Sequence, residues 1–236
     1  MKKNRSYFPG KYQFYGRRKG YSISESRLKL INELLPKLLI DLEKPGLITP
    51  SILFNKGADV WLEVGFGAGE HLVAQAERYP DIGFIGCEPY INGVARVLSE
   101  IRQKSLNNIL LHNDDARQVL EKLAPASISK VFILFSDPWP KKRHHQRRFI
   151  NYENLNALSR VMKNRAHLRF VTDDMSFVRW ALNEFHYHPD FVWLINGPED
   201  WRNRHVDAIS TRYEEKAIKR GQKCIYLTFQ RYTRNK

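Results

Sequence analysis

The feature that most constrains this chain is a run of alternating glycines in the segment Glu63-Val64-Gly65-Phe66-Gly67-Ala68-Gly69. Residues 58–64 are apolar and β-branched, which predicts a buried strand, and residues 70–78 have the pattern of a helix. A strand, a glycine-rich turn and a helix in this order present backbone N–H groups to a nucleotide at the edge of a sheet. We therefore expect an α/β fold with a nucleotide-type pocket at this turn.

The residues around the turn indicate which nucleotide it binds. Dinucleotide sites use the spacing G-x-G-x-x-G, whereas this chain has G-x-G-x-G with Glu63 two residues before the first glycine. A carboxylate there repels a pyrophosphate but attracts the cationic amino and sulfonium end of S-adenosylmethionine. The next apolar run ends at Glu88, where an acidic residue binds ribose hydroxyls. Glu63 could instead be an ordinary strand-end acid beside a tight turn, but both acids together favour the methyl donor, with Gly65, Gly67 and Gly69 as its backbone contacts.

Strand and helix patterns alternate along the rest of the 236 residues, which predicts a doubly wound sheet. The expected strands are residues 59–64, 82–87, 109–112, 130–136, 167–172, 191–195 and 224–230. The expected helices are residues 70–78, 91–104, 116–123, 151–164, 174–185 and 211–220. The last strand alternates apolar and polar residues, as expected near the edge of a sheet.

Three segments are predicted along the chain: an N-terminal arm (1–21), a helix and linker (22–55) and the α/β domain (56–236). Ser22 and Glu25 have the spacing of a capping box, and Pro36 should kink or end the helix that follows. Pro45-Gly46 and residues 55–57 are typical of a linker into the core.

The composition favours a cytoplasmic protein. Neither an apolar stretch long enough to span a bilayer nor a secretory signal is visible. The only cysteines, Cys87 and Cys224, fall in strands that should not be neighbours, so we expect reduced core thiols. The histidine pairs lack partners at zinc-site spacing, so no metal is expected. No obligate protein partner is evident.

The charge balance indicates a polyanionic partner. Lys and Arg total 39 against 25 Asp and Glu, a formal net charge of +14. Residues 1–20 combine seven cations with five interleaved aromatic rings and no acid, as in an RNA-binding arm, although a solvated basic tail is the alternative. A second basic cluster, residues 141–148, follows directly on the loop after the fourth predicted strand.

Carboxylates follow each of the first five predicted strands. They are Glu63, Glu88, Asp114-Asp115, Asp137 and Asp173-Asp174. An Asp before a helix is usually its N-cap, and singly that is the better interpretation for the two Asp pairs. Five such loops at one sheet edge are harder to explain by capping alone, and they suit a cationic cofactor and the N–H donors of a base.

The loop Asp137-Pro138-Trp139-Pro140 carries the most information. Its prolines stiffen it, so Asp137 could bond a base edge and Trp139 could stack, unless Trp139 simply plugs the core. Because the basic cluster comes next, a bound polyanion would be brought against the donor methyl group. Nucleic acid is therefore predicted to be the substrate.

At these residues the chain resembles the bacterial tRNA (guanine-N7-)-methyltransferases. The resemblance rests on the glycine turn, Gly86-Cys-Glu-Pro, Asp115-Ala, Phe135-Ser-Asp-Pro-Trp-Pro-Lys-Lys-Arg-His, Thr172-Asp and Thr211-Arg-Tyr-Glu, and spans most of residues 58–230. It implies a Rossmann-like class I methyltransferase: a mostly parallel seven-stranded sheet with an antiparallel C-terminal strand, plus the basic N-terminal extension. It also implies methyl transfer from S-adenosylmethionine to N7 of a variable-loop guanosine in tRNA.

The resemblance assigns roles to individual residues. It implies that S-adenosylmethionine is bound by Glu63, Glu88, Asp115 and Asp137, of which Asp137 is also the catalytic residue. Substrate contacts would come from Lys141, Asp173, Thr211, Arg212, Tyr213 and Glu214. RNA contacts would come from Lys142, Arg143, His144, Arg147 and Arg148. By their spacing alone, Thr211 and Glu214 form a helix cap. The family resemblance implies that the start of this helix is a lid over the guanine.

Three other functions stay open at this point. An exocyclic-amine methyltransferase would carry Asn/Asp-Pro-Pro-aromatic after the fourth strand, from which Asp137-Pro-Trp-Pro departs. A non-catalytic RNA-binding module with a vestigial nucleotide fold would bind the donor without transferring the methyl group. A nicotinamide oxidoreductase is the least compatible with Glu63.

Overall fold

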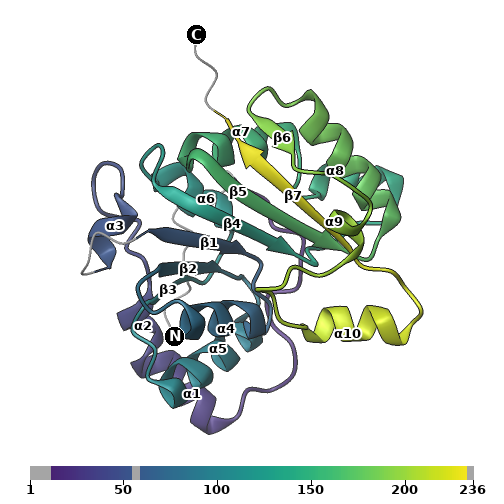
Figure 1. The fold of residues 1–236 in the computed structure, drawn as a ribbon. Helices are drawn as coiled ribbons and strands as arrows, with labels where there is room; N and C mark the ends of the chain where they lie inside the picture. Colours follow the sequence, from purple (N-terminus) through teal and green to yellow (C-terminus); the bar gives the residue numbers. More distant parts are fainter. Residues whose placement is uncertain (1–11, 55–58, 233–236) are drawn as a thin grey trace.

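The computed structural model describes residues 12–54 and 59–232, and its centre is one seven-stranded sheet (Figure 1). The strands are β1 (Val60–Val64), β2 (Gly83–Cys87), β3 (Ile109–His112), β4 (Ile128–Leu134), β5 (Met162–Thr172), β6 (Phe191–Trp193) and β7 (Ile225–Arg231). Their order is β3-β2-β1-β4-β5-β7-β6, with β1 to β5 parallel and β7 antiparallel to both neighbours. The predicted mostly parallel sheet with an antiparallel C-terminal strand is confirmed.

Helices cover both faces of the sheet (Figure 1). They are α1 (Glu25–Glu33), α2 (Leu35–Leu38), α3 (Pro50–Leu53), α4 (Glu70–Arg78), α5 (Ile91–Lys104), α6 (Ala116–Lys122), α7 (Tyr152–Val161), α8 (Met175–Tyr187), α9 (Glu199–Arg202) and α10 (Arg212–Lys219). The 3-10 helix η1 spans Lys142–Arg147. One buried cluster joins α6, α7 and α8 to the sheet, and a second joins α1, α2, α4 and α5 to its other face.

Strand β1 shows why the sheet needs both layers. Val60, Leu62 and Val64 belong to the first cluster, whereas Trp61 between them packs in the second. All five β1 residues are buried, as expected for a central parallel strand covered on both faces. The side-chain alternation of the strand therefore supplies both cores at once.

Several core boundaries agree with the sequence prediction, but β5 begins at Met162, inside the predicted helix 151–164, and β4 ends at Leu134, before the predicted end of strand 130–136. Helices 70–78 and 91–104 and strand 109–112 are confirmed as predicted. The capping box at Ser22 is wrong, because α1 begins at Glu25 after Ser24, and Ser24 makes no side-chain cap hydrogen bond. Pro36 does break the helix, since α2 starts just before it. The predicted linker residues 55–57 lie outside the described residues.

The short elements α3, α9 and η1 were not predicted, because segments of four to six residues are too short to show a periodic pattern. Cys87, at the end of β2, and Cys224, directly before β7, are buried free thiols, and β2 and β7 are not neighbours in the sheet, as predicted. Among the helices in the described part of the chain, none is long and apolar enough to cross a membrane.

The first turn of α5 packs closely against the glycine turn. A Cβ placed on Gly93, in the first turn of α5, would lie 2.0 Å from the carbonyl oxygen of Gly67. No real Cβ sits that close to backbone, so a side chain at Gly93 would push α5 off the turn.

We therefore expect Gly93→Ala to lower the free energy of unfolding by about 1–3 kcal/mol, because overpacking outweighs the better helix propensity of alanine. Urea denaturation measures this. Gly197→Ala is the control, since a Cβ there meets no atom within 4 Å. Equal stabilities for the two variants would contradict the close approach.

Candidate active site

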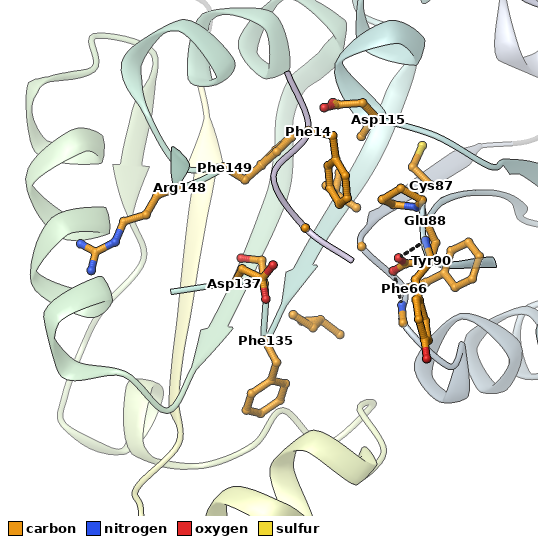
Figure 2. Close-up of a pocket in the computed structure, with 18 of the residues that line it drawn as sticks. Phe14, Phe66, Cys87, Glu88, Tyr90, Asp115, Phe135, Asp137, Arg148 and Phe149 are labelled. Carbon is orange, nitrogen blue, oxygen red and sulfur yellow. Dashed lines mark hydrogen bonds between the residues drawn. The ribbon is translucent and has the colours of Figure 1, made fainter. Parts of the chain in front are cut away.

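A cavity of about 490 Å³ opens at the carboxyl ends of the parallel strands (Figure 2). Its size is within the range of small-molecule sites. The loops after β1, β2, β3 and β4 all contribute to its walls, and the wall acids are Glu63, Glu70, Glu88, Asp114, Asp115 and Asp137. The sheet therefore brings four of the five predicted carboxylate loops to one cavity.

The glycine turn has the backbone shape that only glycine adopts easily. Gly65, Gly67 and Gly69 have φ of 72°, 57° and 77°. Gly65 donates its N–H to the carbonyl of Cys87 at 2.8 Å, and Gly67 donates to a Glu88 carboxylate oxygen at 2.7 Å. The turn after β1 is thus fastened to the end of β2.

Glu88 holds the two loops together. One carboxylate oxygen accepts from Gly67 and the other accepts from the N–H of Tyr90 at 2.8 Å, the contacts dashed in Figure 2. Burial raises the pKa of the Glu88 carboxyl, and these two hydrogen bonds oppose the rise. Each oxygen keeps a further lone pair, so the carboxylate can position the turn and still accept from a ligand.

Glu63 has a partner that the sequence analysis missed. Nδ1 of His71 lies 2.7 Å from a Glu63 carboxylate oxygen, and both side chains are buried. Both residues line the cavity. The position of His71 in the sequence could have indicated this contact. His71 lies in the first turn of α4, and α4 begins at the same edge of the sheet as Glu63.

The acids after β3 are engaged by cations. Asp115 caps α6 by accepting from the N–H of Arg117 at 3.0 Å, and the Arg117 guanidinium donates to its other oxygen at 2.6 Å. Asp114 pairs with Arg18 at 2.8 Å. The capping interpretation of Asp115 is confirmed, and its carboxylate also lines the cavity.

Asp137 differs from all these acids. Its carboxylate makes no hydrogen bond or ion pair with any described residue, and it faces the cavity (Figure 2). Partial loss of hydration between the cavity walls raises the pKa of its carboxyl. Its loop is strained, since Phe135 and Trp139 have φ of 50° and 45°, and such strain is concentrated at functional sites.

Trp139 lines the cavity and does not fill the hydrophobic core. It is half-buried, with its ring edge-on to Tyr15 at a centroid distance of 6.2 Å. The Arg147 guanidinium lies 5.1 Å from the Trp139 ring centroid and 4.0 Å from that of Tyr15. The alternative that Trp139 fills the interior is wrong.

The basic cluster of residues 141–148 divides into exposed and buried cations. Lys142 and Arg143 are exposed, while His144 and Arg147 are half-buried. Arg148 belongs to the cavity lining, but its side chain is only 1% exposed and its guanidinium points away from the cavity (Figure 2), which argues against the predicted RNA contact. It donates to the Pro138 carbonyl at 2.7 Å and to Ser176 Oγ at 2.8 Å. These hydrogen bonds hold the Arg148 guanidinium against the Asp137 loop.

The predicted substrate residues are only partly brought together. Thr211 and Tyr213 line the cavity, whereas Lys141, Arg212, Asp173 and Glu214 do not. Thr211 caps α10 by accepting from the N–H of Glu214 at 3.3 Å, as its spacing predicts. Buried Glu214 instead accepts from the hydroxyl of Tyr226.

Two contacts hold the start of α10 over the glycine turn. Arg212 donates to Glu70 at 2.6 Å. The Tyr213 ring lies beside Gly67 and nearly parallel to the Phe135 ring, at 19° and 6.4 Å between centroids. A helix start that covers the turn is compatible with the predicted lid.

Comparison with known proteins identifies the family. Residues 57–227 match a family described as a putative methyltransferase. The chain is 47% identical over 228 residues to the tRNA (guanine-N(7)-)-methyltransferase of a Ruegeria species, covering 92% of this chain and 87% of the relative. It is 44% identical over 226 residues to that of Rhodospirillum rubrum, covering 94% and 89%. The chain belongs to the tRNA (guanine-N7-)-methyltransferase family.

Solved structures share the fold of this tRNA (guanine-N7-)-methyltransferase family member. An rRNA methylase from Streptococcus thermophilus matches with a TM-score of 0.51 at 9% identity, over 90% of this chain and 100% of the other. A SAM-dependent O-methyltransferase from Thermotoga maritima matches with a TM-score of 0.50 at 14% identity, over 88% and 72%. At such identities the likeness concerns the fold alone, and it confirms the Rossmann-like architecture.

The residues of the cavity are compatible with the predicted donor, S-adenosylmethionine. The acids around the glycine turn suit a cationic ligand, and Glu88 retains acceptor capacity. Ser136 Oγ, on the cavity wall, is buried and finds no hydrogen-bond partner among the described residues, so a polar ligand atom could satisfy it. No group of three or more His, Cys, Asp or Glu side chains in residues 12–54 and 59–232 is arranged to hold a metal ion.

We expect Arg148→Ala to lower the free energy of unfolding by about 2–4 kcal/mol, because it leaves the partners of a buried cation unpaired. Arg147→Ala, one residue earlier and half-buried, should cost less than about 1 kcal/mol. Urea denaturation of both variants measures the difference. If Arg148→Ala were as stable as the wild type, Arg148 would not be what holds the Asp137 loop in place.

Proposed function

We propose that this protein transfers a methyl group from S-adenosylmethionine to N7 of a guanine in tRNA, in the variable loop. The observation that carries the proposal is Asp137, an unpaired carboxylate on a braced loop between the glycine turn and the basic cluster. The names of the curated relatives support tRNA as the acceptor.

Methyl transfer to guanine N7 requires no general base from the protein. S-adenosylmethionine supplies an electrophilic methyl group, and guanine N7 has an in-plane lone pair and carries no proton. No base is therefore needed to deprotonate N7 before transfer. Catalysis comes from in-line positioning and from negative charge that opposes the positive charge developing on the purine.

Asp137 is placed to supply that negative charge. Its carboxylate has no competing partner in the described structure, so it can accept from the N1–H and N2–H edge of guanine. Tyr213 and Phe135 both line the cavity, and their nearly parallel rings offer aromatic faces for the base. Asp173 stays a proposed substrate contact, through RNA that extends beyond the cavity.

The donor would be held by the acids of the first two loops. Glu63, positioned by His71, faces the cationic amino end, and Glu88 accepts from the ribose. Gly65, Gly67 and Gly69 let the ligand approach the backbone. Asp115 contributes to the same wall.

The acceptor would be held by the exposed part of the basic cluster. Lys142, Arg143, His144 and Arg147 lie beside the cavity on η1, and the formal net charge of +14 favours a polyanion. Lys141 and Arg212 are exposed cations next to the same opening and are proposed to contact phosphates.

The direct test is incubation of the protein with bulk tRNA and labelled donor, followed by borohydride reduction and aniline cleavage. Strand scission reports N7-methylguanosine and its position together. Donor binding without methyl transfer to any RNA would instead favour the non-catalytic RNA-binding module.

We expect Asp137→Ala to lower kcat by about 100-fold or more, because it removes a preorganised charge from the transition state. Single-turnover methyl transfer to tRNA measures the loss. Asp137→Asn keeps the shape of the side chain and should also be impaired, whereas Asp41→Ala, at an exposed acid, should be unaffected. Near wild-type turnover by Asp137→Ala would refute the assignment.

We expect Arg147→Ala to weaken tRNA binding and to flatten the plot of log affinity against log salt by about one phosphate contact. Arg148→Lys should leave that slope unchanged, because the side chain at this position is buried. Filter binding across a salt series measures both. An unchanged slope for Arg147→Ala would place it outside the RNA interface.

A further inference from the structure

The N-terminal arm is packed against the domain from residue 12 onward. We define the strap as residues 12–21, and its residues 13–17 line the same cavity as the glycine turn and Asp137. Residues 1–11 of the predicted arm lie outside the described residues. The strap crosses the cavity between the β2 and β3 loops on one side and the Asp137 loop on the other (Figure 2).

The first end of the strap is held by α6. The Tyr12 ring lies under the Arg117 guanidinium, at 4.5 Å from the ring centroid, and its hydroxyl donates to Glu121. Arg117 also donates to the carbonyl of Gln13 at 3.3 Å. Since Arg117 binds Asp115 as well, the strap is tied to a wall acid of the cavity.

The other end of the strap is held by α5. Asn92 accepts from the N–H of Gly20 at 2.8 Å and donates to the carbonyl of Tyr21 at 2.8 Å. The N–H of Ile91 donates to the carbonyl of Arg18 at 3.0 Å, and the Arg18 guanidinium pairs with Asp114. Both ends therefore bind elements that begin at the cavity edge.

Between these anchors Phe14 and Tyr15 both line the cavity, and Phe14 is the ring at its nucleotide side. Phe14 is half-buried, lines the cavity and lies on the side of Asp115, Cys87 and Glu88 (Figure 2). Glu88 marks the position of the ribose in the proposed function, so Phe14 is at the nucleoside end of the site. A ring there offers a flat apolar face to a purine.

The contacts of the strap differ from those expected of an RNA-binding arm. An RNA-binding arm needs its rings exposed to stack on unpaired bases. Here Tyr12 is engaged by Arg117, Tyr15 packs on Trp139 and Arg147, and Phe14 points into the cavity. These three rings and the Arg18 guanidinium are thus engaged by this protein's own residues, whereas Arg17, Lys19 and Tyr21 are exposed.

We infer that the strap is a wall of the methyl-donor site and that the Phe14 ring contacts the adenosine moiety of the donor. This inference rests on the proposed function for the identity of the donor. It assigns the strap to cofactor binding, where its composition alone indicated RNA.

The test uses the full chain and two non-reactive probes, S-adenosylhomocysteine and 5′-methylthioadenosine, by calorimetry. Phe14→Ala should weaken both by about tenfold, as for loss of one ring stacked on a base. Its affinity for tRNA, measured without donor, should stay within about twofold of the wild type. Tyr21→Ala is the control, because Tyr21 is in the strap but 88% exposed.

A second pair of variants tests the anchoring. Arg18→Ala removes the ion pair with Asp114 and should weaken S-adenosylhomocysteine several-fold, whereas Lys19→Ala removes an exposed charge and should not. If Phe14→Ala fails to fold by thermal unfolding, this pair decides: equal affinities for the two variants overturn the inference.

Three results with folded Phe14→Ala would overturn it. They are unchanged affinity for both probes, loss of tRNA affinity alone, and loss for S-adenosylhomocysteine without loss for 5′-methylthioadenosine, which would place the ring at the methionine end. Failure of the proposed function is distinct, since it shows as wild-type protein that leaves tRNA unmethylated at N7 while still binding the probes.

Discussion

The parallel pairing of β1 with β2 on one side and β4 on the other is the constraint on which the site depends. The chain continues from β1 through α4 to β2 on one side, whereas it continues from β4 through α7 to β5 on the other side. The loops after β1 and β4 therefore diverge and leave a crevice at the carboxyl ends. The glycine turn and Asp137 stand on its two sides. Moving α5 off Gly67, or the Asp137 loop off Arg148, would close or reshape this crevice.

The acids that line the crevice differ in whether they have a hydrogen-bond or ion-pair partner. Glu63 is bound by His71, Asp115 by Arg117 and Glu88 by two backbone N–H groups, so each is held in one orientation. Asp137 alone among the wall acids of the first four loops has no partner in the described structure. Fixed acids suit a donor that must be held in one pose, and an unpaired acid suits an acceptor that arrives later.

Much of this could be predicted from the sequence, because the signals were local. The strand–turn–helix at Gly65, Gly67 and Gly69 and the Asp137-Pro-Trp-Pro loop were each readable from adjacent residues. Arg148 was misassigned because burial depends on which element packs over a side chain. The arm was interpreted from charge and rings alone, and that pattern does not say which surface binds them.

The sequence by itself determined the α/β class, the positions of most strands and helices, and the edge at which the chemistry lies, since period and turn residues act over a few positions. Only the tertiary structure decided the partners: His71 for Glu63, Ser176 for Arg148, and the cavity for Phe14. These contacts join residues from separate elements, which chain proximity does not encode. Their geometry comes from the packing of the helices and the strap on the sheet.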